Sequence, residues 1–288
     1  MKALTHCWVE KRSSASRLEI RPIFSSCAGE LSTSLRNPVR TESGAGELGF
    51  AASRGNAKSE NLNAKLTFKK EDDQWKDNFY LTALRSKGQV TVATLEGTPP
   101  DQHLVNVSKY DTTANRYEAG ASVGYKLDER SYIVGALRYE NDDFSPFEYQ
   151  WVASIGYGYT VLKNASDELS FEVGPGYKTY KPVDTVAPFG NPPVLVTTSY
   201  DSSSEVVGRG LIAYKHAFTD TTSFVDTFLV EAGSDNTFIQ NDAGLQVAIN
   251  KSFALKVGYQ VRNNSDVAPG IKKTDQLITT NLVYNFGG

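Results

Sequence analysis

The residue types that most often do enzyme chemistry are few and scattered in this sequence. Its histidines are His6, His103 and His216. On a strand, a nucleophile two residues past His216 would share its face, so that His216 could activate it. Phe218 stands there instead. We therefore expect no enzyme activity, and a membrane lipid-modifying enzyme is an alternative that these residues do not support.

Metal and cofactor chemistry has no better basis in the sequence. The two cysteines are Cys7 and Cys27, and no Cys and His residues have the spacing of a zinc site. No Gly-rich loop precedes a helix that could hold a phosphate group. The sequence thus indicates neither a metal nor a cofactor.

Charged residues placed between alternating apolar ones form the more informative set. Because a strand points successive side chains to opposite faces, these charges share one face of a predicted sheet. Both signs are present, so the side chains can pair across strands and fill an enclosed bore, or water can fill it and leave a narrow channel. The mixture of signs argues against strong ion selectivity. The candidate lumen-lining residues are Glu47, Lys65, Glu118, Arg138, Glu140, Glu172, Arg209, Lys215, Glu231, Lys256, Arg262 and Asp275.

The segments that carry these charges alternate with a period of two from Gly44 onward. In the clearest case the apolar residues run from Phe253 through Val257 to Val261, with small or polar residues between them. A helix would scatter these apolar side chains around its axis, whereas a strand places them on one face. Twelve segments are predicted as strands, over residues 45–53, 59–70, 74–86, 115–127, 130–142, 148–162, 168–181, 204–218, 222–234, 238–250, 252–263 and 274–286.

The lengths of these segments favour a barrel that spans a membrane. Ten residues of about 3.3 Å each, tilted by about 40°, rise about 25 Å, which is the height of the apolar band of an outer-membrane barrel. The connections alternate between tight turns and longer loops, and the longest loops are predicted at residues 87–114 and 182–203. An even number of strands then places both termini on the short-turn side, which faces the periplasm in such barrels.

The composition agrees with this architecture and excludes others. The 288 residues carry 30 Lys and Arg against 33 Asp and Glu, so no basic field favours a nucleic-acid partner. No apolar stretch approaches the ~18 residues that a transmembrane helix needs, and the mean hydropathy is −0.38. A helical membrane protein is excluded, but a barrel is not, because its strands carry polar residues at every second position.

Aromatic residues indicate which face meets lipid. Tyr117 and Tyr125 lie near opposite ends of one predicted face, as do Trp151 and Tyr159 on another, which is typical of the interfacial girdles of membrane barrels. Twelve strands also enclose a bore too wide for apolar side chains to fill. The sequence therefore predicts an all-β protein, a closed antiparallel up-and-down transmembrane β-barrel of about twelve strands. A soluble ligand-binding β-barrel is the alternative.

The last predicted strand alternates up to a nearly terminal Phe. Leu282, Tyr284 and Phe286 form a candidate C-terminal assembly signal, followed by Gly287 and Gly288. We expect the outer-membrane barrel assembly machinery to recognise this strand. The expected product is a monomer in the bacterial outer membrane, in contact with outer-membrane lipid and lipopolysaccharide.

Several short motifs occur in a fixed order along the predicted barrel. They are Gly46–Phe50 followed by Gly55-Asn56, Tyr139–Phe144, Gly156–Tyr159, Glu172–Tyr177 and Leu282–Phe286. Together, over about residues 44–286, they resemble the salt-induced outer-membrane proteins of the YdiY type, a family of unknown function. The resemblance implies an outer-membrane location and a link to salt stress. The charged inner face leaves two functions open, a narrow channel for small polar solutes and an envelope-stabilising protein. The resemblance implies no substrate and no catalytic residues.

Residues 1–43 differ from the rest of the chain. An export signal should contain an uninterrupted apolar stretch of 7–15 residues, but Arg21 splits the nearest candidate, Ile20–Phe24. We interpret residues 1–43 as an atypical leader, a disordered N-terminal segment or a misassigned start. The outer-membrane barrel is predicted to occupy residues 44–288.

Overall fold

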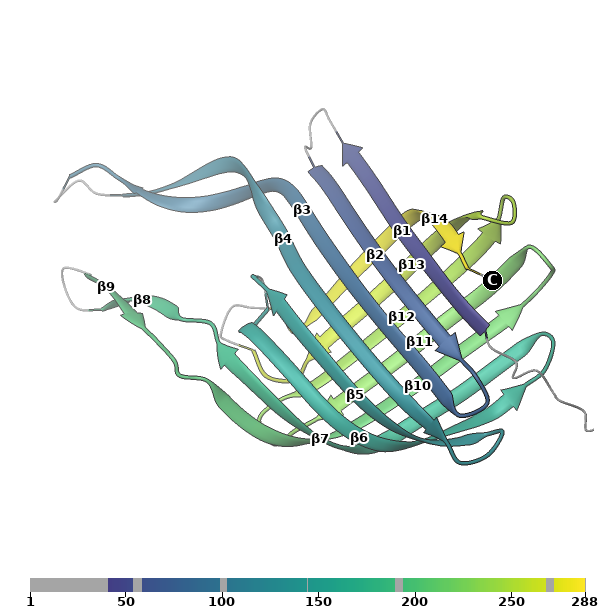
Figure 1. The fold of residues 1–288 in the computed structure, drawn as a ribbon. Coiled ribbons are helices and arrows are strands. Elements are labelled where there is room, and N and C mark those ends of the chain that lie inside the picture. The colour runs from purple at the N-terminus through teal and green to yellow at the C-terminus, as the bar shows by residue number, and fades with distance from the viewer. Residues whose placement is uncertain are drawn as a thin grey trace, which may run out of the picture. The chain divides into compact units, whose positions relative to one another are not determined.

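The chain forms a closed antiparallel β-barrel in this computed structural model (Figure 1). The structure describes residues 41–53, 59–98, 103–143, 145–189, 194–267 and 272–287. Most of the predicted leader, residues 1–40, lies outside the described residues. Among the described segments, twelve strands close the barrel in the order β1-β14-β13-β12-β11-β10-β7-β6-β5-β4-β3-β2, and a separate two-stranded sheet pairs β8 with β9.

The strands of the barrel are long, with between 11 and 24 residues each. Every neighbouring pair is antiparallel, and β1 closes the barrel by pairing with β14 from Gly44↔Phe286 to Gly49↔Asn281. The barrel strands are β1 Thr41–Ser53, β2 Ser59–Glu71, β3 Trp75–Glu96, β4 His103–Lys126, β5 Ser131–Asp142, β6 Phe147–Lys163, β7 Asp167–Pro182, β10 Ser203–Ala217, β11 Thr222–Ala232, β12 Thr237–Ala248, β13 Phe253–Asn264 and β14 Thr274–Phe286.

The predicted fold class and strand count are confirmed, but the long loop predicted at residues 87–114 is wrong. Strand β3 continues to Glu96 and β4 begins at His103. Beyond Gly88, β3 pairs only with β4, so the two strands leave the barrel wall as a two-stranded arm (Figure 1). The physical reason lies in the run from Val90 to Leu95, which is rich in β-branched residues that favour strands.

The Pro-rich connection at residues 182–203 also differs from a plain loop. It contains β8 Thr185–Phe189 and β9 Val194–Thr198, which pair with each other and with no barrel strand. The β3–β4 arm and this hairpin both lie at the end of the barrel that carries the longer connections. The predicted contrast between a short-turn end and a long-loop end is therefore present.

The five short turns share one closing device. In each turn, the first or second residue after the strand has a side-chain oxygen that accepts two hydrogen bonds. The donors are the backbone N–H groups of the residues two and three positions further along the chain. In the β2–β3 turn, Asp72 Oδ1 accepts from Gln74 and Trp75 at 2.9 and 2.8 Å, and these bonds hold the pKa of Asp72 below its ordinary value. The accepting residues of the five turns are Asp72, Asp128, Asn164, Thr219 and Asn250.

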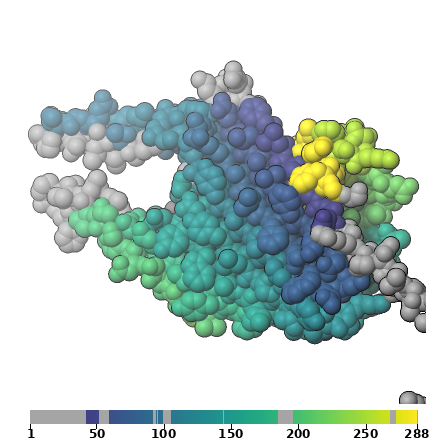
Figure 2. All heavy atoms as spheres, in the orientation of Figure 1, coloured from purple at the N-terminus to yellow at the C-terminus, as the bar shows by residue number. Residues whose placement is uncertain are grey.

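The two faces of the barrel wall have opposite character. On the outer face large apolar side chains are exposed, such as Ile155 at 61% and Val257 at 49%, whereas the inner-face residues Glu140 and Arg262 are 1% and 5% exposed. Figure 2 shows the wall from β2 to β7 as a continuous surface of side chains. Because the apolar side chains cover the outside, the alternative of a soluble barrel with an apolar core is excluded.

Aromatic side chains pack against each other near both ends of the outer face. Near the short turns, Trp75 lies 5.3 Å from Tyr125 between ring centroids, and Phe253 lies 5.1 Å from Tyr284. Near the long loops, Trp151 lies 6.2 Å from Tyr177. Such belts match the two interfaces of a bilayer. Within the described ranges, no helix is both long and apolar enough to cross a membrane.

Candidate functional site: the charged bore

The strand register places all twelve predicted lumen-lining residues on one face of the wall. In one continuous row, Glu47 is opposite Lys65, the row continues through Thr82, and it reaches Glu118 and Glu140. Ion pairs between strands that are not neighbours show that this face points inward. The charged side chains therefore meet inside the barrel, which we call the bore.

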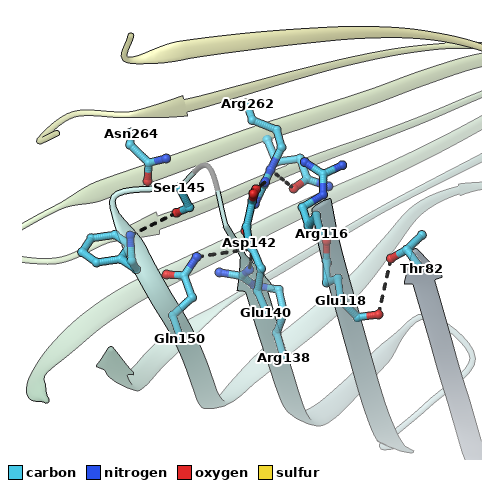
Figure 3. Close-up of polar contacts among 12 residues, drawn as sticks. Thr82, Arg116, Glu118, Arg138, Glu140, Asp142, Ser145, Gln150, Arg262 and Asn264 are labelled. Atoms are coloured by element: carbon cyan, nitrogen blue, oxygen red, sulfur yellow. Dashed lines mark hydrogen bonds and ion pairs between the residues drawn. The ribbon is translucent and has the colours of Figure 1, made fainter. Parts of the chain in front are cut away.

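A central network of five charged residues crosses the bore. Arg138 of β5 donates to Glu140 at 2.6 Å and forms a two-pronged pair with Glu231 of β11, in which Nε lies 3.1 Å from Oε1. Arg262 of β13 reaches Glu140 at 2.5 Å and Asp142 at 3.2 Å. Strands β5 and β13 are six places apart in the twelve-strand order, so the Arg262–Glu140 pair joins opposite walls (Figure 3).

Amide and aromatic side chains complete the central network. Gln150 donates to Glu140 at 3.3 Å, and Arg262 Nε donates to Gln240 Oε1 at 3.1 Å. The ring of Phe238 is fully buried, and the guanidinium carbons of Arg138 and Arg262 lie 4.8 and 4.9 Å from its centroid. Buried charges need such partners, because an unpaired charge away from water is costly.

A second buried pair lies on the wall formed by β7 and β10. Lys178 and Glu205, which are 1% and 5% exposed, lie opposite each other in the register with 3.4 Å between Nζ and Oε1. The Lys178 ammonium also lies 4.6 Å from the ring centroid of Phe147 and 4.9 Å from that of Tyr180. Cation–π contacts of this kind stabilise an ammonium group that has lost its water.

Two further ion pairs are held nearer the short-turn end. Arg209 donates to Glu172 at 3.0 Å, and Lys256 donates to Glu47 at 2.9 Å. Glu172 also accepts from the hydroxyl of Tyr132 at 3.1 Å, and Glu47 accepts from Asn281 at 3.1 Å.

Glycines on the inner face let two tyrosines lie flat along the wall. A Cβ at Gly120 would overlap the ring of Tyr80, and one at Gly158 would overlap the ring of Tyr132. The Tyr80 ring in this position brings its hydroxyl 2.7 Å from Glu118. The glycines thus place phenol groups where they bind bore carboxylates.

Four predicted residues form no ion pair within the described part of the chain. They are Lys65, Glu118, Lys215 and Asp275, and Glu118 accepts a hydrogen bond from the Tyr80 hydroxyl instead. Asp275 lies opposite Arg262 in the register but its side chain is exposed at the long-loop end. Lys65 places its ammonium 5.9 Å from the centroid of the Tyr80 ring, and Lys215 lies opposite Glu168 in the register.

Several members of these networks are not among the predicted lumen-lining residues. Lys178 and Glu205 occupy inner-face positions in predicted strands and could have been found by the same alternation. Phe238 could not, because an apolar residue on a polar face gives no signal until its two arginine neighbours are placed. Asp142 is not among the predicted lumen-lining residues, but it ends β5 and binds Arg262.

The outer-face residues with possible chemistry have structural partners. His216 faces outward near the short turns, where its Nδ1 lies 2.7 Å from Asp167 Oδ1 and its ring contacts Phe218. Among the described residues, no group of His, Cys, Asp and Glu could hold a metal ion. The candidate assembly residues Leu282, Tyr284 and Phe286 lie on the outer face of β14, which pairs with β1.

The closed barrel, its apolar outer face and its charged bore define this protein as a porin-like β-barrel of the bacterial outer membrane. Residues 46–286 match the family model described as "Protein of unknown function, DUF481", and the chain belongs to this family. The uncharacterized protein YdiY of Escherichia coli (strain K12) is 27% identical over 239 residues, which cover 82% of this chain and 80% of YdiY. The predicted resemblance to the YdiY type is thereby confirmed.

Two solved structures were also found to be similar. The translocator domain of the autotransporter NalP from Neisseria meningitidis has a TM-score of 0.44 and 11% identity, with 86% of this chain and 88% of that chain covered. The NanC porin has a TM-score of 0.42 and 9% identity, with 85% of this chain and 98% of that chain covered.

Proposed function

We propose that this protein is a narrow, non-enzymatic channel for small polar solutes, constricted by ion pairs that cross its bore. One observation carries the proposal. Arg262 of β13 meets Glu140 of β5 on the opposite wall at 2.5 Å, so a solute must pass beside this pair. Both side chains are nearly fully buried, which makes the long-loop half of the bore the dry and narrow part.

The alternative is a closed barrel that stabilises the envelope. The same buried network supports it, because paired charges and the rings of Phe147, Tyr180 and Phe238 occupy space inside the wall. The channel is favoured because several inner-face lysines near the short turns remain exposed to water, as Lys69 and Lys215 do. A salt-stress role is part of the proposal through the family resemblance. Normal growth of a deletion strain at high salt would contradict this salt-stress role.

The expected cellular setting follows from the same architecture. We propose that the barrel is a monomer inserted by the outer-membrane barrel assembly machinery through the strand that carries Leu282, Tyr284 and Phe286. Lipid and lipopolysaccharide would then surround its apolar outer face. Truncation of β14 before Leu282 should abolish insertion, because β1 would lose its closing partner.

Planar-bilayer recording of the full-length protein tests the channel directly. We expect stable, small ohmic steps that added polyethylene glycols of small radius reduce and larger ones do not, because only the small polymers enter a narrow bore. Inserted protein that never conducts would contradict the channel and favour the closed barrel. Heat-modifiable gel migration of the same sample confirms that the protein is folded in either case.

A further inference from the structure

The inner face near the short turns carries, beside its ion pairs, several lysines that form no salt bridge within the described residues. Lys69 lies two residues before the end of β2, Lys76 is the second residue of β3, and Lys215 lies two residues before the end of β10. Lys65 lies on the same face of β2, four residues before Lys69 and with Thr67 between them. These four lysines, Lys65, Lys69, Lys76 and Lys215, define what we call the lysine vestibule.

The lysines of the vestibule come from opposite walls and face one another. Strands β2 and β10 are six places apart in the twelve-strand order. The charged groups within electrostatic range of Lys69 are Lys65, Lys76, Lys215 and Glu168. Four ammonium groups therefore share one region of the bore, and Glu168 is the carboxylate that lies near Lys69.

None of the four ammonium groups forms a salt bridge or a hydrogen bond within the described ranges. Two are held against tyrosine rings instead, with Lys65 5.9 Å from Tyr80 and Lys76 5.0 Å from Tyr132. The other acids of this region are already occupied. Glu47 binds Lys256 and Asn281, and Glu71 at the rim binds Lys126 and Lys163 at 2.8 and 3.1 Å.

The two halves of the bore thus differ in how their charges are paired and in how far their charged side chains are exposed to water. In the long-loop half, cations and carboxylates are paired and buried, as Arg138 and Glu231 are at 6% and 1% exposure. In the vestibule, Lys69 and Lys215 are exposed to the water of the bore. Crowded, hydrated ammonium groups repel one another, and an anion between them relieves that repulsion while accepting their hydrogen bonds.

We propose that the lysine vestibule binds small oxyanions, of which inorganic phosphate is the simplest, and that it gives the channel a preference for anions. The proposal deepens the proposed function by naming the class of solute. Each lysine supplies up to three N–H donors on a flexible stem, which suits a tetrahedral oxyanion that enters from the short-turn end. The ion pairs above the vestibule slow its further passage.

Calorimetric titration of the detergent-solubilised full-length protein with sodium phosphate at low ionic strength tests the site. We expect saturable binding with a Kd on the order of 1 mM. The double variant Lys69→Gln/Lys215→Gln should weaken binding at least about tenfold, since it removes one ammonium from each wall. The double variant Lys109→Gln/Lys272→Gln, which removes two exposed lysines at the long-loop end, should bind as the wild type does.

Three results of the titration would contradict the proposed anion site. Absence of phosphate binding by the wild type, or equal affinity of wild type and Lys69→Gln/Lys215→Gln, would overturn it. Equal weakening in both double variants would overturn it too, because net charge and not the vestibule would then explain the binding. Bilayer recordings test the channel proposal separately. Phosphate binding without conductance would support the anion site and contradict the channel.

Discussion

Replacement of Arg262 by alanine is expected to destabilise the barrel and to enlarge its conductance. Arg262 is 5% exposed, and its loss leaves Glu140 with Arg138 as its remaining guanidinium partner and removes the donor to Gln240 Oε1. Breaking a buried pair costs about 3–5 kcal/mol. We expect about 3 kcal/mol here, because water of the bore can reach the vacated space. The same change removes the side chain that spans the bore, so single-channel steps should increase.

Urea unfolding in micelles and planar-bilayer recording measure the two effects of Arg262→Ala. Arg130→Ala is the matched control, because Arg130 lies in the exposed β4–β5 turn and its guanidinium makes one long contact, 3.4 Å to the carbonyl of Val161. The control should unfold and conduct as the wild type does. If Arg262→Ala behaved like the control in both measurements, the cross-bore pair would be neither a structural link nor a constriction.

An arginine on the outer face should be far more damaging than one on the inner face of the same strand. Ile278 is 74% exposed near the middle of β14, and the next residue, Thr279, faces the bore. An arginine facing lipid near the bilayer midplane costs about 2–4 kcal/mol, whereas bore water can hydrate an arginine on the inner face. Ile278→Arg should therefore lower the free energy of unfolding in lipid vesicles by about 2–4 kcal/mol relative to Thr279→Arg.

The comparison of Ile278→Arg with Thr279→Arg keeps position, strand and added charge nearly constant. Unfolding followed by tryptophan fluorescence gives the difference between the two variants directly. Equal destabilisation would mean that the two faces meet the same medium, and a larger cost for Thr279→Arg would reverse the assignment of the faces.

The twelve strands were predictable because one physical constraint repeats along the whole chain. A wall that meets lipid on one side and the charged bore on the other requires apolar and polar residues to alternate, as they do from Phe253 to Val261. For every barrel strand except β3 and β4, the predicted bounds fall within a few residues of those observed. The arm beyond Gly88 was missed because the sequence reasoning ended strands where the membrane ends. The backbone of β3 and β4 continues to pair without lipid.

The inner-face charges were predictable as a set, but their partners were not. Alternation assigns Arg138, Glu231 and Arg262 to one face without saying which strands lie across the bore from one another. That depends on the closure of β1 onto β14 and on the resulting order of the strands. The uneven distribution of paired and unpaired charges along the bore was not predictable for the same reason. Lys69 and Lys215 are far apart in sequence, and only closure of the barrel brings them into the same region of the bore.

Spin labelling along β13 tests most directly whether the apolar face meets lipid and the charged face meets the bore. Nitroxides attached to single cysteines at Leu255, Val257, Lys256 and Gln260 would be compared for collisions with oxygen, which concentrates in lipid, and with a water-soluble nickel chelate. We expect labels at Leu255 and Val257 to favour oxygen and those at Lys256 and Gln260 to favour the chelate. The opposite alternation, or none, would contradict this assignment of the two faces.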